Sequence, residues 1–343
     1  MIKNIKELKD ALEEKINTCS KVFITPHIGP DCDAIGSAIA LNIICNKLGK
    51  EAFIIIDDKR EKMDNSVKMI IDELPDSINI ITSIDALKFL DDDSLLVVVD
   101  TNKKDLIPFT YVEAFKNIVV IDHHKPGITS IETDASYIDI NASSACEIMY
   151  QLMILFSIKL DHTKTLEEHH MPSNICNYLL SGIILDTSKL TKNVTARSMD
   201  VVAKLLKKGA NMNYANDLFL DDFESDMRVS NLVSKTVWKM FNIGIAMNNE
   251  YPDTIYFKED LAKVADWLIK YKATDASFAL GYIEPGIVYI SARSKGGVDV
   301  GEIMSQLGGG GNECSGAARI VSNDIKSLRL KLDDVIRPGY KLK

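Results

Sequence analysis

Short apolar runs alternate with longer helical patterns along the first half of the chain. The runs consist mainly of Val, Ile, Leu and Phe and cover residues 22–25, 52–56, 78–81, 95–99 and 118–121. Each run is bounded by polar residues and is shorter than a typical helix, which indicates buried strands. Apolar helices are expected at 34–48, where Gly49 follows the last turn, and at 144–156. Strands that alternate with helices in this way predict a parallel sheet in an α/β fold.

The last third of the chain predicts a second, smaller α/β domain. Two strands are expected at 276–283 and 288–291, joined by a Glu-Pro-Gly hairpin turn at 284–286, with helices on either side. A cationic helix at 195–209 lies between the two regions. We therefore predict a first domain at 1–190, a connector at 191–217 and a second domain at 218–343. The active site is expected in the cleft between the two domains.

Side chains that can bind metal ions follow four of the apolar segments. Asp122, His123 and His124 end the strand predicted at 118–121. Similar groups follow the segments at 22–25, 95–99 and 182–185. The ligand crevice of an open parallel sheet lies outside the carboxyl ends of its strands, so we expect these side chains to converge. The eight candidates are His27, Asp31, Asp33, Asp100, Asp122, His123, His124 and Asp186.

This set of donors has a defined chemistry. Carboxylates and imidazoles without a thiolate suit a hard or borderline divalent ion such as Mn²⁺, Mg²⁺ or Fe²⁺. Eight groups exceed the needs of one ion that also binds water and substrate, so they suit two ions that share a carboxylate. Asp31 and Asp33 are two residues apart, and an extended loop would turn one toward each ion. One acid after a strand is often only a helix cap, but four such segments predict a dinuclear site.

These motifs resemble those of the DHH phosphoesterases, in particular the subfamily with a C-terminal DHHA1 domain. The segment at 27–37 is similar to the first motif of the family, with Cys32 in place of a Gly. Asp100 stands for the second motif, 122–124 is the motif that names the family, and 182–187 resembles the fourth. The subfamily contains nano-RNA exonucleases, pAp phosphatases and phosphodiesterases of cyclic or linear dinucleotides.

The resemblance implies two metal sites that share one carboxylate. The first is formed by His27, Asp31 and Asp100. The second is formed by Asp33, Asp100, His123 and Asp186. The resemblance also places His124 close to the substrate phosphate and Asp122 behind the histidines as an orienting carboxylate. The usual ion of the family is Mn²⁺, with Mg²⁺ or Fe²⁺ as alternatives.

The second domain departs from the family pattern at its glycine-rich signature. The family has three glycines followed by His, whereas Gly311 or Asn312, depending on the alignment, stands in place of that His. Residues 291–297 still resemble the Arg-Ser segment of the family, and the Arg293 guanidinium could grip two phosphate oxygens at once. A glycine run alone would indicate a flexible turn, but beside this segment it favours a phosphate cradle. The expected substrate contacts are Arg293, Ser294, Gly309, Gly310, Gly311, Asn312 and Ser315.

The composition of the chain limits the kinds of molecule that it could bind. The net charge of −9 argues against long duplex DNA and against a membrane surface, because both favour a basic face. The six cysteines include no Cys-x-x-Cys pair, and neither a signal peptide nor a long apolar span is found. A cytoplasmic protein is therefore expected, and a homodimer is compatible with these features. Trp238 and Trp267 could stack on a base, but we expect them to pack in the core or between domains.

These observations together predict a Mn²⁺-dependent phosphoesterase that acts on small nucleotides. Its substrates would be short single-stranded RNA, pAp, or linear or cyclic dinucleotides. A hydroxide held between two ions would attack phosphorus, Asp100 would bridge the ions, Arg293 would stabilise the developing charge, and His124 would assist the leaving oxygen. The alternatives are a pyrophosphatase or exopolyphosphatase, which needs no base pocket, and a metal-binding nucleotide sensor with weak turnover.

Overall fold

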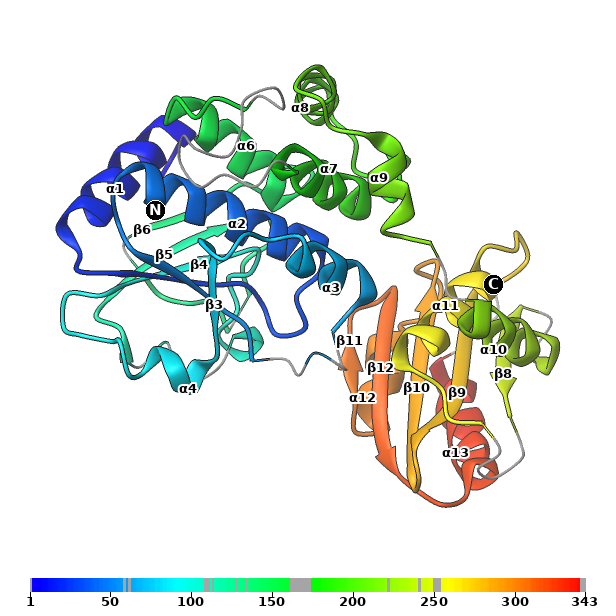
Figure 1. The fold of residues 1–343 in the computed structure, drawn as a ribbon. Helices are drawn as coiled ribbons and strands as arrows, with labels where there is room; N and C mark the ends of the chain where they lie inside the picture. Colours follow the sequence, from blue (N-terminus) through cyan, green and yellow to red (C-terminus); the bar gives the residue numbers. More distant parts are fainter. Residues whose placement is uncertain are drawn as a thin grey trace. The chain divides into compact units, whose positions relative to one another are not determined.

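The computed structural model describes most of the chain. The described residues are 2–57, 60, 63–107, 112, 114–127, 129–133, 135–160, 174–220, 223–239, 242–248 and 254–339. The chain divides into two units, unit 1 (Met1–Leu220) and unit 2 (Asp221–Lys343). Both are α/β units, as predicted (Figure 1). No helix in the described residues combines the length and the apolar character needed to cross a membrane.

Unit 1 is built on a parallel sheet with the strand order β3-β2-β1-β4-β5-β6. Its strands are β1 (Val22–Thr25), β2 (Ala52–Ile55), β3 (Asn79–Ile81), β4 (Leu95–Val99), β5 (Asn117–Asp122) and β6 (Ala135–Ile138). Its helices are α1 (Ile5–Thr18), α2 (Cys32–Lys47), α3 (Asn65–Asp72), α4 (Ser83–Ala86), the 3₁₀ helix η2 (Lys104–Leu106), α6 (Ala145–Leu155), α7 (Ile175–Asp186), α8 (Ala196–Lys207) and α9 (Met212–Asp217). The parallel sheet predicted from the alternating pattern is confirmed.

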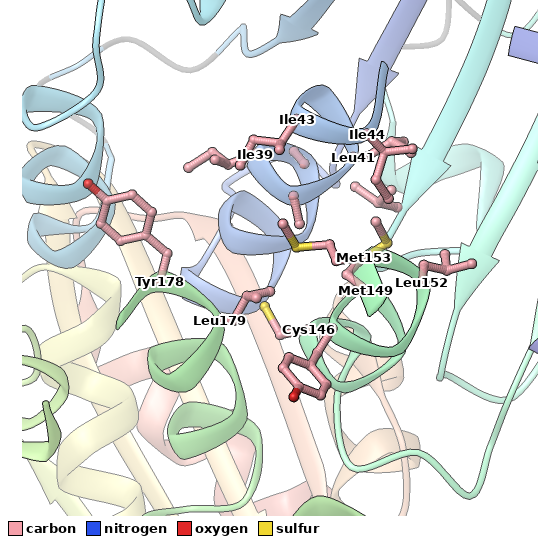
Figure 2. Close-up of a cluster of buried hydrophobic side chains, with 14 of the residues drawn as sticks. Ile39, Leu41, Ile43, Ile44, Cys146, Met149, Leu152, Met153, Tyr178 and Leu179 are labelled. Carbon is pink, nitrogen blue, oxygen red and sulfur yellow. The ribbon is translucent and has the colours of Figure 1, made fainter. Parts of the chain in front are cut away.

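Apolar residues on both sides of each strand explain the layers of unit 1. Every residue of β4 is buried, which is typical of a central strand covered on both faces. Helix α2 has buried residues on all sides, because it packs on the sheet and is covered by α6 and α7. Figure 2 shows this cluster, in which Ile39 and Ile43 of α2 lie with Met149 and Met153 of α6 and Leu179 of α7. The dense packing fixes the ends of the three helices, and two of these ends carry site residues.

The strand order of unit 1 also indicates where a ligand-binding site would lie. From β1 the chain adds strands first on one side (β2, β3) and then on the other (β4, β5, β6). Such a reversal leaves a crevice outside the carboxyl ends of the two strands where the order changes, β1 and β4. The loops after these strands contain His27, Asp31 and Asp100.

Two parts of unit 1 differ from the pattern-based expectations. Strand β6 was not predicted, because its four residues are short and partly polar. The predicted connector at 191–217 carries α8 and α9, whose apolar residues Val201, Leu205 and Ala215 join the core of unit 1.

Unit 2 contains a mixed sheet with the strand order β11-β12-β10-β9-β8-β7. Its strands are β7 (Thr236–Lys239), β8 (Ile243–Met247), β9 (Ala276–Glu284), β10 (Ile287–Ser294), β11 (Gly310–Gly311) and β12 (Ser315–Val321). Its helices are α10 (Phe223–Ser234), α11 (Lys258–Ile269), α12 (Val300–Gln306) and α13 (Ile325–Gly339). Neighbouring strands are antiparallel except β8 and β9. One apolar cluster joins the sheet to α12 and α13, and another joins it to α10 and α11.

Candidate metal centre

A cluster of acids and histidines forms at the carboxyl ends of β1, β4 and β5. His27 and Asp31 lie in the loop after β1, Asp100 follows β4, and His123 follows β5. Asp186 is the last residue of α7, the helix that packs on α2. The cluster therefore collects residues from segments that are far apart in the sequence and that the parallel sheet and the helix packing bring together.

Asp100 occupies the centre of this cluster and is almost fully buried. Its backbone has φ = 59°, in the left-handed region, which Asp tolerates better than most residues. Its N–H donates to the Ile121 carbonyl of β5 at 3.0 Å. The Oδ2 atom of Asp100 lies 3.6 Å from His27 Nε2, and its Oδ1 atom lies 3.3 Å from His123 Nε2. One carboxylate thus faces two groups of candidate ligands.

The first group comprises His27, Asp31 and Asp100, whose ligand atoms lie within 4.8 Å of one another. Asp31 is also the N-cap of α2, because its Oδ1 accepts hydrogen bonds from the N–H groups of Asp33 (2.9 Å) and Ala34 (3.1 Å). Its Oδ2 lies 3.9 Å from His27 Nε2. Asp31 and Asp33 belong to different groups, and they separate at a helix N-terminus rather than in the extended loop that we expected.

The second group comprises Asp33, His123 and Asp186. His123 Nε2 lies 3.7 Å from Asp33 Oδ2 and 3.0 Å from Asp186 Oδ2. Asp33 is fully buried, and its two oxygens accept hydrogen bonds from the N–H groups of Ala145 (2.7 Å) and Cys146 (2.8 Å). These are the first N–H groups of α6, and the N-terminus of a helix stabilises a carboxylate.

The electrostatics of the cluster favour cations. Burial, together with the charge of Asp186, raises the pKa of Asp33 to about 6. Burial and the charge of Asp33 raise the pKa of Asp100 well above its usual range. Burial opposes ionisation of His123, but the adjacent carboxylates of Asp100 and Asp186 outweigh it and raise the pKa of His123 to about 11. Protons are therefore held tightly where carboxylates crowd together, and divalent cations would relieve the same repulsion.

Two buried atoms support the same interpretation. Asp100 Oδ1 and His123 Nε2 have no hydrogen-bond partner among the described residues. Buried polar atoms are rarely left unpaired, and a bound cation would supply the partner that these two atoms need. Carboxylate oxygen and imidazole nitrogen are suitable donors for Mn²⁺, Mg²⁺ or Fe²⁺. The residues present therefore fit two divalent ions that share Asp100.

Asp122 lies fully buried behind the two histidines. Its Oδ1 accepts a hydrogen bond from the His123 N–H at 2.8 Å and lies 2.9 Å from His124 Nδ1. Burial favours the neutral acid, but the bond with His124 outweighs it and lowers the pKa of Asp122. The contact occupies Nδ1 of His124, so Nε2 is the ring nitrogen that remains for a ligand. About half of the His124 side chain is exposed.

Asn102 completes this arrangement and was not among the predicted site residues. Its Nδ2 donates to Asp122 Oδ2 at 2.6 Å and to the backbone carbonyl of His124 at 3.0 Å. Its Oδ1 accepts a hydrogen bond from Ser130 Oγ at 2.8 Å. The one signal in the sequence was its place two residues after Asp100. Asn102 therefore holds the turn that presents both histidines.

In unit 2, Arg293 is already engaged by a carboxylate. Its Nε lies 2.8 Å from Asp266 Oδ1 and its Nη2 lies 3.4 Å from Asp266 Oδ2. Its Nη1 donates to the Ala292 carbonyl at 3.0 Å. Ser294 next to it accepts hydrogen bonds from two backbone N–H groups of the following turn. Asp266 was not predicted as part of this region, and it holds the guanidinium in a fixed orientation.

The glycine-rich segment packs closely against β12. Gly310 and Gly311 form β11, which pairs with Ala317 and Gly316. The Asn312 side chain accepts hydrogen bonds from the N–H groups of Cys314 and Ser315, both at 2.9 Å. Ser315 is also the pairing partner of Arg293 in the neighbouring strand. The structure thus brings Arg293, Ser315 and the glycine segment to one edge of the unit 2 sheet.

The fold and the cluster define an α/β protein with a carboxylate–imidazole cluster that could hold metal ions. The model of the DHH family, N-terminal domain, matches residues 21–183, and the model of the DHHA1 domain matches residues 242–337. The chain belongs to the DHH/DHHA1 phosphoesterase family, as its motifs predicted.

Individual relatives agree with this assignment. The chain is 31% identical to the cyclic-di-AMP phosphodiesterase GdpP of Bacillus subtilis over 97% of its length and covers 50% of that protein. It is 25% identical to the bifunctional oligoribonuclease and PAP phosphatase NrnA of Thermus thermophilus, covering 93% of this chain and 91% of that protein. The chain spans about half the length, or less, of the first curated relatives it matches.

A crystal structure of an exopolyphosphatase-related protein from Bacteroides fragilis has the same fold. It superposes with a TM-score of 0.76 at 18% identity and covers 97% of this chain and 96% of that chain.

Proposed function

We propose that the chain is a divalent-metal-dependent phosphoesterase that hydrolyses small nucleotides, with Mn²⁺ as its ion. The observation that carries this proposal is the position of Asp100, whose two oxygens face two separate ligand groups. The names of the relatives support the substrate class, because one is a cyclic-di-AMP phosphodiesterase and another an oligoribonuclease and PAP phosphatase.

Each group of side chains has a proposed role in this reaction. One ion would be held by His27, Asp31 and Asp100. The other would be held by Asp33, Asp100, His123 and Asp186. When bound, two such ions lower the pKa of water and neutralise charge that develops on phosphate. His124 would present Nε2 to the leaving oxygen, because Asp122 occupies its Nδ1 atom. Arg293, with Ser294, Ser315 and the glycine segment, would bind the phosphate or the nucleotide.

The test is a substrate panel with a matched pair of variants. Purified protein would receive Mn²⁺ and one of a short oligoribonucleotide, pAp, a linear or cyclic dinucleotide, pyrophosphate or polyphosphate. We expect hydrolysis of a nucleotide that stops on chelation and falls by roughly 10³-fold or more in Asp100→Asn, in the range seen when single catalytic groups are removed. Asp92→Asn, an exposed acid, is the control and should be unchanged.

The same panel decides between the alternative functions. Release of phosphate from pyrophosphate or polyphosphate alone would identify a polyphosphate-type hydrolase. Nucleotide binding without any release would identify a sensor. Full activity of Asp100→Asn on the best substrate would refute the shared-carboxylate site itself.

A further inference from the structure

Three aromatic side chains form an exposed cluster at one end of unit 2. Trp238 of β7, Trp267 of α11 and Tyr271 after α11 have exposed fractions of 45%, 43% and 51%. The Trp238 and Tyr271 rings meet edge to face with centroids 6.4 Å apart. Trp267 Nε1 donates to the Tyr271 hydroxyl at 3.3 Å. Both tryptophans were expected in the core or between domains, and their exposure shows that neither lies in the core.

The backbone holds these rings in place. Trp238 lies opposite Gly244 of β8, and a Cβ atom at Gly244 would come within 3.1 Å of the indole ring. Trp267 and Tyr271 are four residues apart and lie on the same side of the helix end. Lys295 donates to the Tyr271 carbonyl, which ties this end of α11 to the segment after β10. The rings are therefore presented by defined backbone positions, which lowers the entropic cost of stacking against a ligand.

Three lysines lie next to Tyr271. Lys270 and Lys272 flank Tyr271 in the sequence, Lys295 contacts its backbone, and all three lysines are exposed. The chain as a whole carries a net charge of −9, so this concentration of lysines is a local feature. Exposed aromatic rings beside cationic side chains are the usual combination of surfaces that bind single-stranded nucleic acid.

The register of the sheet connects the cluster to Arg293. One row of paired residues crosses five strands and consists of Trp238, Gly244, Ser277, Arg293 and Ser315. Ser277 Oγ donates to the Ala265 carbonyl and Arg293 pairs with Asp266, so this row faces α11. Three strand spacings of about 4.8 Å separate Trp238 from Arg293, or roughly 14 Å. This distance joins the backbones of the two residues, and the indole ring of Trp238 lies over Gly244, one strand nearer to Arg293.

We propose that Trp238, Trp267 and Tyr271 bind an unpaired base of a single-stranded oligonucleotide by stacking, with the neighbouring lysines contacting its phosphates. This inference rests on the proposed function and narrows its substrate class. A mononucleotide such as pAp has a single base, whereas an oligonucleotide carries further unpaired bases linked to the phosphate at Arg293. The surface would therefore contribute more to the binding of short single-stranded RNA than to that of pAp.

The chain offers a direct measurement, because it contains two tryptophans and both lie in this cluster. The full-length protein, without divalent cations so that turnover is prevented, would be titrated with a short oligoadenylate or with AMP. We expect saturable quenching of tryptophan fluorescence by oligoadenylate and much weaker quenching by AMP. Trp238→Phe and Trp267→Phe would each leave one reporter and should both retain binding, because Phe also provides a ring face.

Alanine variants then measure the contribution of each ring. With a labelled oligoadenylate, Trp238→Ala and Trp267→Ala should each weaken binding roughly tenfold, within the range for loss of one stacked base. Phe257→Ala removes an exposed aromatic ring near the other end of α11 and should bind as the wild type does. Mn²⁺-dependent hydrolysis of pAp by the wild type tests the metal centre separately.

Two results would overturn the inference even if pAp were hydrolysed. One is an unchanged tryptophan signal, or unchanged binding by both alanine variants, at saturating oligoadenylate. The other is fluorescence that depends on protein concentration and not on nucleotide, which would make the cluster a contact between copies of the chain. If oligoadenylate quenches as expected while no substrate is turned over, the stacking surface stands and the proposed hydrolysis fails.

Discussion

Gly182 tests how strictly the helix packing of unit 1 positions the metal centre. It lies one turn before Asp186 on α7, facing Asp33 of α2. In Gly182→Ala the new methyl group would lie 2.7 Å from Asp33 Oδ1 and 2.5 Å from Cys146 Sγ. Favourable contacts between non-bonded atoms begin near roughly 3.5 Å, so these groups must separate by about 1 Å.

Two opposing effects set the change in the free energy of unfolding caused by Gly182→Ala. Overpacking of a buried site costs about 1–3 kcal/mol, whereas Ala in place of Gly inside a helix gains about 1 kcal/mol. The free energy of unfolding of the metal-free protein should therefore fall by no more than about 2 kcal/mol. The larger effect should be on metal binding, because the hydrogen bonds from Ala145 and Cys146 hold Asp33 in place. Loss of such outer contacts weakens metal binding by roughly 10–100-fold.

Titration calorimetry with Mn²⁺ and thermal unfolding with and without Mn²⁺ would measure the two effects separately. At saturating Mn²⁺, a 10–100-fold weaker Kd removes about 1.4–2.7 kcal/mol of the stabilisation that the ion provides. Gly127→Ala is the control, since a Cβ atom there meets nothing within 4 Å. If Gly182→Ala bound Mn²⁺ within about twofold of the wild type, the packing around Asp33 would not control the centre.

Three further predictions concern the turn held by Asn102, the protonation of Asp33, and the histidine of the family pattern that is absent from the glycine-rich segment. Asn102→Ala removes the two hydrogen bonds that Asn102 donates to the turn containing Asp122. In steady-state kinetics, kcat should fall roughly 10–100-fold with little change in KM. Because the pKa of Asp33 is raised to about 6, Mn²⁺ must displace a proton at lower pH, so its affinity should decrease as the pH falls through 6; a Kd independent of pH would contradict this. The same shift stabilises the metal-free fold at acid pH, and that contribution is lost as the pH rises through 6. Gly311→His should lower Tm sharply, because a Cβ atom would lie 2.2 Å from a backbone carbonyl of β12. Asn312→His places the side chain on the surface and should remain folded. Equal Tm values for the two variants would show that the backbone of this segment moves to accommodate the Cβ atom.

The local pattern of the chain was sufficient for the central strands and for the cluster that follows them. β1 and β4 coincide with the predicted runs because continuous apolar residues between polar boundaries have few other solutions. Asp100 and His123 converge because parallel strands end at one edge of a sheet. These conclusions required only the order of residues and the rule that the carboxyl ends of parallel strands lie at the same end of the sheet.

Contacts between distant segments decided the remaining features. Asp33 is held by the first turn of α6, more than one hundred residues away, and Asn102 is held by Ser130 from another loop. Arg293 is a free cation in the sequence but a paired one in the fold, because α11 places Asp266 beside it. Trp238 was expected in the core or between domains, but it is not in the core because β7 is an edge strand and exposes it. Pattern and periodicity report which face of an element is apolar, whereas the partner that meets each polar side chain depends on how the elements pack.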